Sequence, residues 1–139
     1  MIVLDACAIC EMVRQTEKGQ ALKSLALRNE VAISCELVRA EVVSVFRKLA
    51  RTEKLSPKEA EGYVEAGLNL IDKFKPIEPL QAEVLRESMR LDHSPYDMFY
   101  FVLARRTGAT LFTTDKKLMK LCEKHGVDCV SEIELEELT

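Results

Sequence analysis

The sequence has no tryptophan, only five glycines and four prolines, and no apolar run of membrane-spanning length. So few glycines and prolines exclude a collagen-like or low-complexity chain. A membrane helix needs about 20 apolar residues, whereas the longest apolar runs, such as 98–104, soon end at charged residues. The opening MIVLDACAIC contains no basic residue, so it lacks the n-region of a secretory signal. We therefore expect a cytoplasmic protein that is not inserted in a membrane.

A strong excess of charge of either sign is also missing, because the formal net charge is −3. The last nine residues, SEIELEELT, hold four glutamates and no base, which leaves 20 basic against 19 acidic residues in 1–130. The composition therefore does not by itself indicate a nucleic-acid-binding protein. Any attraction for a polyanion must come from a local basic patch.

The five cysteines are an odd number, and without a secretory signal they are most simply reduced thiols packed as small apolar side chains. Cys7 and Cys10 form a C-x-x-C motif, which is typical of redox pairs and of half a zinc site. No second pair of cysteines or histidines stands at ligand spacing, so this isolated motif only weakly supports either function.

The composition is typical of an ordered globular protein, since 47% of residues are hydrophobic and 31% are charged. The length of 139 residues predicts a single domain over 1–139, which ends in an acidic tail at 131–139. Short β-branched runs alternate with longer helical patterns. We expect strands at 1–5, 31–34, about 76–78, 110–113 and 127–130. We expect helices at 6–15, 17–29, 35–51, 56–74, 80–91, 95–107 and 115–125, with a last turn at 132–137. This alternation with uniformly apolar strands predicts an α/β fold, a parallel sheet covered by helices on both faces.

The ends of several helices carry typical capping residues. Ser56 and Ser94 each precede a proline at the first position of an expected helix, which predicts serine N-caps. Gly108 and Gly126 follow expected helices, as C-terminal glycines do. These positions support the predicted boundaries.

In an open parallel sheet the functional crevice lies beyond the carboxyl ends of the strands, and four acids collect there. Asp5 ends the first expected strand, and Asp115 follows the strand at 110–113. Both also stand where a helix N-cap is expected, which would by itself explain an aspartate. Asp97 is the third residue of its helix, where acids are common because they face free N–H groups.

Two of these acids lie close to apolar helix faces. Asp97 lies on the same helix stripe as Phe101 and Ala104, so its side chain should point toward apolar neighbours. A carboxylate in such surroundings needs a polar or charged partner. Glu41 lies about 60° from the centre of the apolar stripe of its helix, by the 100° step per residue. That stripe consists of Val38, Val42, Val45 and Leu49. A pairing of Glu41 with Lys48 is the simpler alternative to a functional role.

Four carboxylates at one end of a sheet suggest a cation site. Two like charges about 4 Å apart repel by about 4 kcal/mol at an effective dielectric of 20, so a cluster of four needs a cation to stay ionised. Oxygen ligands without histidine or cysteine favour Mg²⁺ or Mn²⁺ over zinc. Such an ion can activate a water for attack on phosphorus.

The segments MIVLDACAI, RAEVVSVFRKL and SPYDMFYFVLARRTGATLFTTD, with the order and spacing of the four acids, resemble a PIN domain. The nearest group is the toxin ribonucleases of VapBC-type toxin–antitoxin pairs. The resemblance covers nearly the whole chain and is most specific from Tyr96 to Asp115.

This resemblance implies a three-layer α/β/α sandwich with about five parallel strands in the order 3-2-1-4-5. It places the family's four acids on Asp5, Glu41, Asp97 and Asp115, and its hydroxyl residue on Thr113. It further implies one or two Mg²⁺ or Mn²⁺ ions and hydrolysis of RNA phosphodiesters by water. A small antitoxin partner and a homodimer are implied as well.

We expect Asp5, Asp97 and Asp115 to ligate metal, with Glu41 as a further ligand or as the base that orients water. Ser44 stands where many relatives have asparagine, and Ala6-Cys7 where they have a Ser/Thr-type pair. Both departures remove hydrogen-bonding groups around the acids but no carboxylate. Candidates to hold the RNA backbone, with a solvated helix face as the alternative for each, are Lys116, Lys117, Lys120, Arg39, Arg47 and Lys48.

Other functions compete with the toxin hypothesis. A PIN nuclease of RNA processing has the same residues, and a PIN-like scaffold that binds RNA or protein without catalysis is compatible with Ser44. A receiver-like signalling domain also has an acid after its first strand, but its adjacent acidic pair, its phosphoacceptor aspartate and its lysine after the fifth strand are not recognisable here.

Overall fold

Four strands form the central sheet of the computed structural model, which describes residues 1–26 and 30–139. They are β1 (Ile2–Leu4), β2 (Ala32–Cys35), β3 (Lys73–Lys75) and β4 (Thr110–Phe112). All neighbouring pairs are parallel, in the order β3-β2-β1-β4. The strand expected at 127–130 is reduced to one parallel bridge between Leu111 and Cys129. The predicted order is confirmed, with the fifth position marked by this bridge beside β4.

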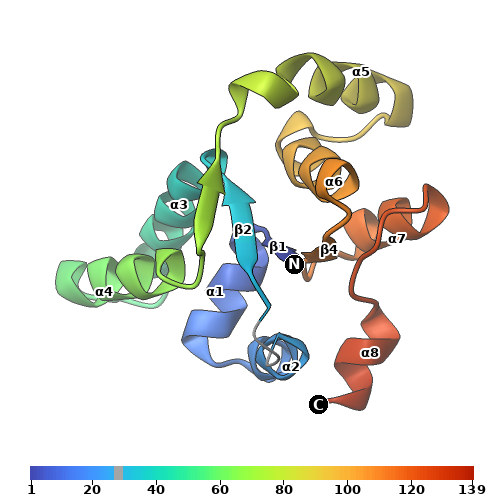
Figure 1. Ribbon diagram of the computed structural model, residues 1–139. Coiled ribbons are helices and arrows are strands. Elements are labelled where there is room, and N and C mark those ends of the chain that lie inside the picture. Colours follow the sequence, from blue (N-terminus) through green and yellow to red (C-terminus); the bar gives the residue numbers. More distant parts are fainter. Residues whose placement is uncertain (27–29) are drawn as a thin grey trace.

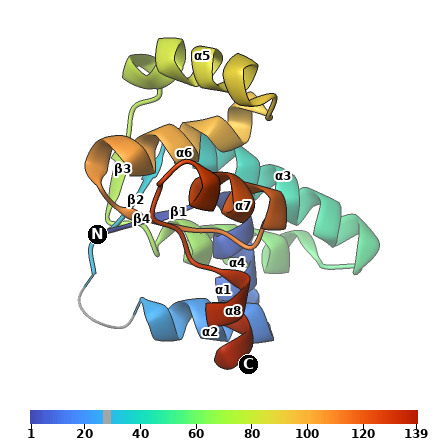
Figure 2. The same cartoon turned by 90° about the vertical axis from the view of Figure 1, so that its right-hand side faces the viewer.

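Helices cover the sheet on both sides, as the alternating pattern predicted (Figures 1 and 2). They are α1 (Ala6–Arg14), α2 (Glu17–Leu25), α3 (Leu37–Thr52), α4 (Pro57–Leu68), α5 (Gln81–Leu91), α6 (Pro95–Thr107), α7 (Lys116–Lys124) and α8 (Glu132–Glu137), with a 3₁₀ turn η1 at Glu78–Leu80. Figure 1 shows α3 and α4 on one side of β2 and β3, and α5 and α6 on the other. The last helix, α8, packs beside α2 near the C-terminus (Figure 2). Among the described residues, no helix is long and apolar enough to cross a membrane.

Several predicted boundaries were wrong. The third strand is Lys73–Lys75 rather than 76–78, because Pro76 lacks the N–H that a ladder needs. The helix expected at 56–74 therefore stops at Leu68. The helix expected at 35–51 begins at Leu37, since Cys35 still pairs with β3. The helix expected at 17–29 ends at Leu25, and positions 27–29 of that prediction lie outside the described residues.

The predicted caps are confirmed with one exception. Ser56 forms a capping box with Glu59 at the start of α4. Gly108 and Gly126 adopt the left-handed conformation, with φ of 68° and 70°, which glycine adopts without a steric penalty. Ser94 occupies the N-cap position of α6, but its hydroxyl makes no capping hydrogen bond.

The core lies between the sheet and its helices and places the ends of β1 and β4 against α6. All three residues of β1 are buried, as expected for a central parallel strand. Helix α6 packs on β1, β2 and β4 and buries Met98, Tyr100 and Phe101. The first two helices approach so closely that a Cβ on Gly19 would lie 1.9 Å from the Glu11 carbonyl oxygen. These contacts hold the start of α1 and the start of α6 at the same end of the sheet.

Candidate functional site

A pocket of about 250 Å³ beyond the carboxyl end of β1 contains three of the four predicted acids, Asp5, Glu41 and Asp97. They come from the β1–α1 junction, from α3 and from the first turn of α6. We call this the acid pocket. Its remaining lining residues are Ala6, Cys7, Ser44, Val45 and Tyr100.

Asp5 is the most buried of these acids, with 3% of its surface exposed. Its Oδ1 accepts the Ala8 N–H at 2.8 Å, so the residue is the N-cap of α1, as its position also predicted. Burial raises the pKa of Asp5 to about 7, and the negative charge of Asp97 adds to the rise. Hydrogen bonds from Thr113, Ala8 and Cys7 oppose it only in part. The capping hydrogen bond alone therefore does not offset the cost of burying this carboxylate in its ionised form.

Glu41 lies half-buried on the flank of α3 and points toward α6. Its Oε1 accepts a hydrogen bond from the Tyr100 hydroxyl, and no ion pair joins it to Lys48 among the described residues. Burial raises the pKa of Glu41, the Tyr100 hydrogen bond lowers it, and Asp97 raises it further. The alternative pairing with Lys48 is therefore not the arrangement in this structure.

Asp97 has the partner that its position on an apolar stripe requires. The Nε2 of His93 lies 2.8 Å from Asp97 Oδ2, which leaves Oδ1 without a hydrogen bond from the described residues. His93 is itself held at the end of α5, where its N–H donates to the Ser88 carbonyl at 3.2 Å. The Ser88 hydroxyl donates to the His93 carbonyl at 2.6 Å. His93 thus restrains the carboxylate of Asp97 from outside the pocket.

Cys7 and Thr113 surround Asp5 on its other side. The Cys7 sulfur lies 3.5 Å from Asp5 Oδ2 and 3.8 Å from the Thr113 hydroxyl, which is fully buried. Burial and the charge of Asp5 raise the pKa of Cys7 to about 12. A thiol that holds its proton so tightly is a poor nucleophile and redox group. Cys7 therefore acts here as a weak donor to a carboxylate, and nothing in its surroundings favours a redox pair with Cys10.

Asp115, the fourth predicted acid, is not among the residues that line the acid pocket. Its Oδ1 accepts the N–H groups of Lys117 and Leu118 at 2.9 and 3.3 Å, so Asp115 is the N-cap of α7. Thr113 lies between Asp115 and the acid pocket, because its hydroxyl accepts the Asp115 N–H at 3.1 Å and lies 3.8 Å from the sulfur of Cys7, which contacts Asp5. The structure thus brings three of the four acids around one pocket and places the fourth beside the hydroxyl of Thr113.

The residues of the acid pocket fit a hard divalent cation. In the part of the chain that the structure describes, no three His, Cys, Asp or Glu side chains are close enough to form a complete metal cage. Mg²⁺ does not need one, because it usually keeps several waters and binds through one or two carboxylates together with substrate phosphates. Oxygens free for such a role are Asp97 Oδ1 and Glu41 Oε2, which accept no hydrogen bond from the described residues. A cation there would also stabilise the ionised forms of Asp5 and Glu41, whose pKa values are raised first by burial and further by the charge of Asp97.

The predicted basic residues are distributed over several surfaces. Lys48 is exposed and lines a hollow that adjoins the acid pocket. Arg39 is engaged elsewhere, since its Nε donates to Glu36 at 2.7 Å and its guanidinium lies 3.7 Å from the Phe74 ring centre. Lys116, Lys117 and Lys120 are exposed on α7, which is capped by Asp115.

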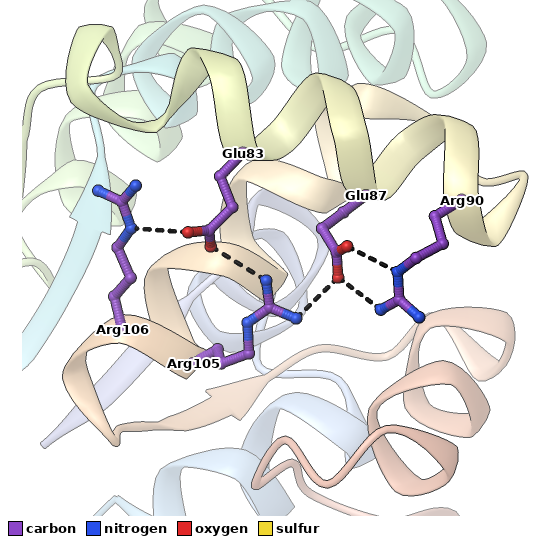
Figure 3. A network of polar contacts seen from close by, with 5 residues as sticks. All are labelled: Glu83, Glu87, Arg90, Arg105 and Arg106. Carbon is purple, nitrogen blue, oxygen red and sulfur yellow. Dashed lines mark hydrogen bonds and ion pairs between the residues drawn. The ribbon is translucent and has the colours of Figure 1, made fainter.

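A charged network joins α5 to α6 (Figure 3), and His93 lies in the short connection between these two helices. Buried Glu87 accepts two 2.8 Å hydrogen bonds from Arg90 and one of 2.7 Å from Arg105. Arg105 and Arg106 also donate to Glu83 at 3.1 and 3.2 Å. The hydrogen bonds from Arg90 and Arg105 lower the pKa of Glu87 to about 2. The bonds from Arg105 and Arg106, like the hydrogen bond from Tyr100 to Glu41, join residues far apart in sequence, whereas Glu87–Arg90 and His93–Asp97 are pairs three and four residues apart.

The comparisons with known proteins agree with this architecture. The crystal structure of PAE2754 from Pyrobaculum aerophilum matches with a TM-score of 0.72 and 23% identity, over 99% of this chain and 88% of that chain. The structure of Mycobacterium tuberculosis VapC20, described as a sarcin–ricin loop cleaving toxin, matches with a TM-score of 0.65 and 17% identity, over 87% of this chain and 95% of that chain. Among curated proteins, the sequence comparison finds no match. At these identities the two structures show a shared fold.

A family model described as the PIN domain matches residues 2–124. That range contains the whole sheet, the acid pocket and Asp115. The chain therefore belongs to the PIN-domain family, whose members are typically nucleases.

Proposed function

We propose that this protein is a metal-dependent endoribonuclease and the toxin of a toxin–antitoxin pair. The observation that carries the proposal is the acid pocket, in which Asp5, Glu41 and Asp97 meet at the carboxyl end of the central strand of a PIN fold. Catalysis by such a pocket requires a divalent cation, for which Mg²⁺ and Mn²⁺ are the expected ions.

In this proposal Asp5 and Asp97 would hold the ion from the acid pocket, and Asp115 from beside it through Oδ2, since only its Oδ1 caps α7. The bound ion would polarise the scissile phosphate and lower the pKa of a water. Glu41 serves as a further ligand or accepts the proton of the attacking water, a role that its raised pKa favours. Tyr100 fixes the direction of the Glu41 carboxylate through the hydrogen bond to Oε1. His93 fixes that of Asp97 in the same way. The chain's own residues thus orient the acids before substrate arrives.

The toxin assignment, with a small antitoxin and a homodimer as partners and a cytoplasmic site of action, rests on the same family membership. VapC20, a structural relative, is described as a toxin that cleaves the sarcin–ricin loop. A nuclease of RNA processing would use the same pocket. An antitoxin-sized reading frame directly upstream, and suppression of cleavage by its product, would separate these two functions. Light scattering of the purified protein tests the homodimer.

Incubation of the purified protein with structured RNAs in Mn²⁺, Mg²⁺ or EDTA tests the reaction. We expect cleavage with either ion, none in EDTA, and none with Asp97→Asn. The matched control is Asp128→Asn, which makes the same chemical change at an exposed residue whose side chain forms no hydrogen bond with the described residues. Full cleavage by the Asp97→Asn protein, or cleavage that persists in EDTA, would refute the proposed mechanism.

A further inference from the structure

Beside the acid pocket, the outer face of α3 forms an open hollow of about 650 Å³, which we call the α3 hollow. Ser44 and Val45 line both this hollow and the acid pocket, so the two are adjacent. The other residues that line it are Arg47, Lys48, Arg51 and Thr52. Residues three and four positions apart lie on the same face of a helix, which explains why this set lines one surface.

The α3 hollow carries three positive charges with no acid among its lining residues. Arg47, Lys48 and Arg51 are all exposed. Within residues 1–26 and 30–139, none of the three lies within ion-pairing distance of a carboxylate. This distinguishes them from Arg39, Arg105 and Arg106, whose guanidinium groups are paired. Their donors are available to an external anion.

Acids at the end of α3 and on the neighbouring helix α4 form no ion pair with the cations of the α3 hollow. Glu53, which follows α3, pairs with Arg14. Glu61 and Glu65 of α4 line a separate apolar hollow on another side of Arg47, and neither forms an ion pair with it. The positive charge therefore stays concentrated next to the negatively charged acid pocket.

We propose that the α3 hollow binds the sugar–phosphate backbone of the RNA segment that continues from the scissile phosphate. This inference rests on the proposed ribonuclease function and adds the path of its substrate. The acid pocket repels phosphates, so association needs compensating cations nearby. From Ser44 to Arg51 the helix rises by about 10 Å at 1.5 Å per residue, which is enough for a few consecutive phosphates. Arginine forms bidentate hydrogen bonds with phosphate oxygens, and lysine adds a point charge.

The predicted arrangement has a thermodynamic signature. Each phosphate neutralised on a single strand contributes about −0.7 to the slope of log K against log salt concentration. Removal of all three cations should therefore reduce the magnitude of this slope by about 2. A role of these residues in folding alone would not change the slope.

The experiment measures binding of a labelled single-stranded 12-nucleotide RNA to the full-length chain by fluorescence anisotropy, in EDTA and over a series of KCl concentrations. The test variant is Arg47→Gln/Lys48→Gln/Arg51→Gln. The matched control removes three exposed charges that lie on other helices and form no ion pair with the described residues, Lys58→Gln/Arg86→Gln/Lys124→Gln. We expect the smaller slope and weaker binding only in the test variant, together with a higher KM in Mn²⁺ and a kcat within about twofold of the wild type.

Equal slopes in the test and control variants would overturn the inference. Unchanged RNA binding with loss of binding to an acidic peptide would also overturn it, since the α3 hollow would then serve a protein partner. A wild-type chain that binds RNA with the expected slope but cleaves none would refute the proposed reaction and leave the binding surface intact. The two proposals therefore fail separately.

Discussion

Replacement of Asp5 by asparagine separates the two roles of this residue, as helix cap and as buried charge. Asparagine caps a helix about as well as aspartate, so the hydrogen bond to Ala8 can be kept. What changes is the cost of ionisation, because burial raises the pKa of Asp5 from 3.8 to about 7.

The sign of the effect follows from proton binding. Because the folded state holds the proton more tightly than the unfolded state, the wild type loses stability as the pH rises from about 4 to about 7. Well below pH 3.8 the carboxyl is neutral in both states, and the two proteins should be equally stable. A shift of about three pKa units corresponds to about 4 kcal/mol. Above pH 7 and in EDTA, Asp5→Asn should therefore exceed the wild type by up to about 4 kcal/mol, or by about 10 °C in Tm.

Thermal unfolding followed by circular dichroism at pH 4 to 8 measures this difference. Addition of Mn²⁺ should then raise the Tm of the wild type and not that of Asp5→Asn, since a ligand stabilises only the state that binds it. Asp5→Ala serves as the control for the cap and should be about 1 kcal/mol less stable than Asp5→Asn at every pH, because both variants lack the ionisable group and only asparagine keeps the cap. Equal stability of wild type and Asp5→Asn at pH 8, or an unchanged response to Mn²⁺, would refute the account of Asp5 as a strained metal ligand.

Three further predictions follow from other contacts. Tyr100→Phe removes the hydrogen bond that lowers the pKa of Glu41, so the acidic limb of the pH–kcat profile should move to higher pH. An acidic limb at the same pH in the variant and the wild type would contradict this role of the Tyr100 hydroxyl. Glu87→Gln should destabilise the fold by about 1–3 kcal/mol at neutral pH. Because the pKa of Glu87 is lowered to about 2, the stability difference between the wild type and Glu87→Gln should disappear as the pH falls from 4.5 toward 2, as measured by urea unfolding. A stability difference that persists near pH 2 would refute the charge-based explanation. Gly19→Ala should destabilise the fold by about 2 kcal/mol or more, because the new methyl group would clash with α1. Gly62→Ala, whose methyl group would meet no atom within 4 Å, should raise the free energy of unfolding by about 0.8 kcal/mol. Thermal melts that show equal effects of the two substitutions would contradict the close approach of α1 and α2.

Local patterns in the sequence were sufficient for much of the fold. The apolar run at 2–4, the Ser56 cap and the glycines at 108 and 126 lie where the structure has a strand, a helix start and two helix ends. The predicted position of the third strand was wrong because the sequence Lys-Phe-Lys is too weakly apolar to indicate a strand. Only the pairing of these residues with β2 identifies them as β3. The fifth strand shortened to one bridge for the same kind of reason, since ladder length depends on the neighbouring strand.

The sequence by itself determined which acids stand at the ends of strands and in the first turns of helices, because caps and apolar stripes depend on neighbours along the chain. Only the tertiary structure decided that Asp5, Glu41 and Asp97 line one pocket while Asp115 caps α7 beside it. It also decided that Tyr100 of α6 orients Glu41 of α3, and that cations of α3 which form no ion pair with the described residues border the same pocket. The physical reason is that hydrogen bonds and charge interactions act over a few ångströms in space, whatever the separation of the residues in sequence.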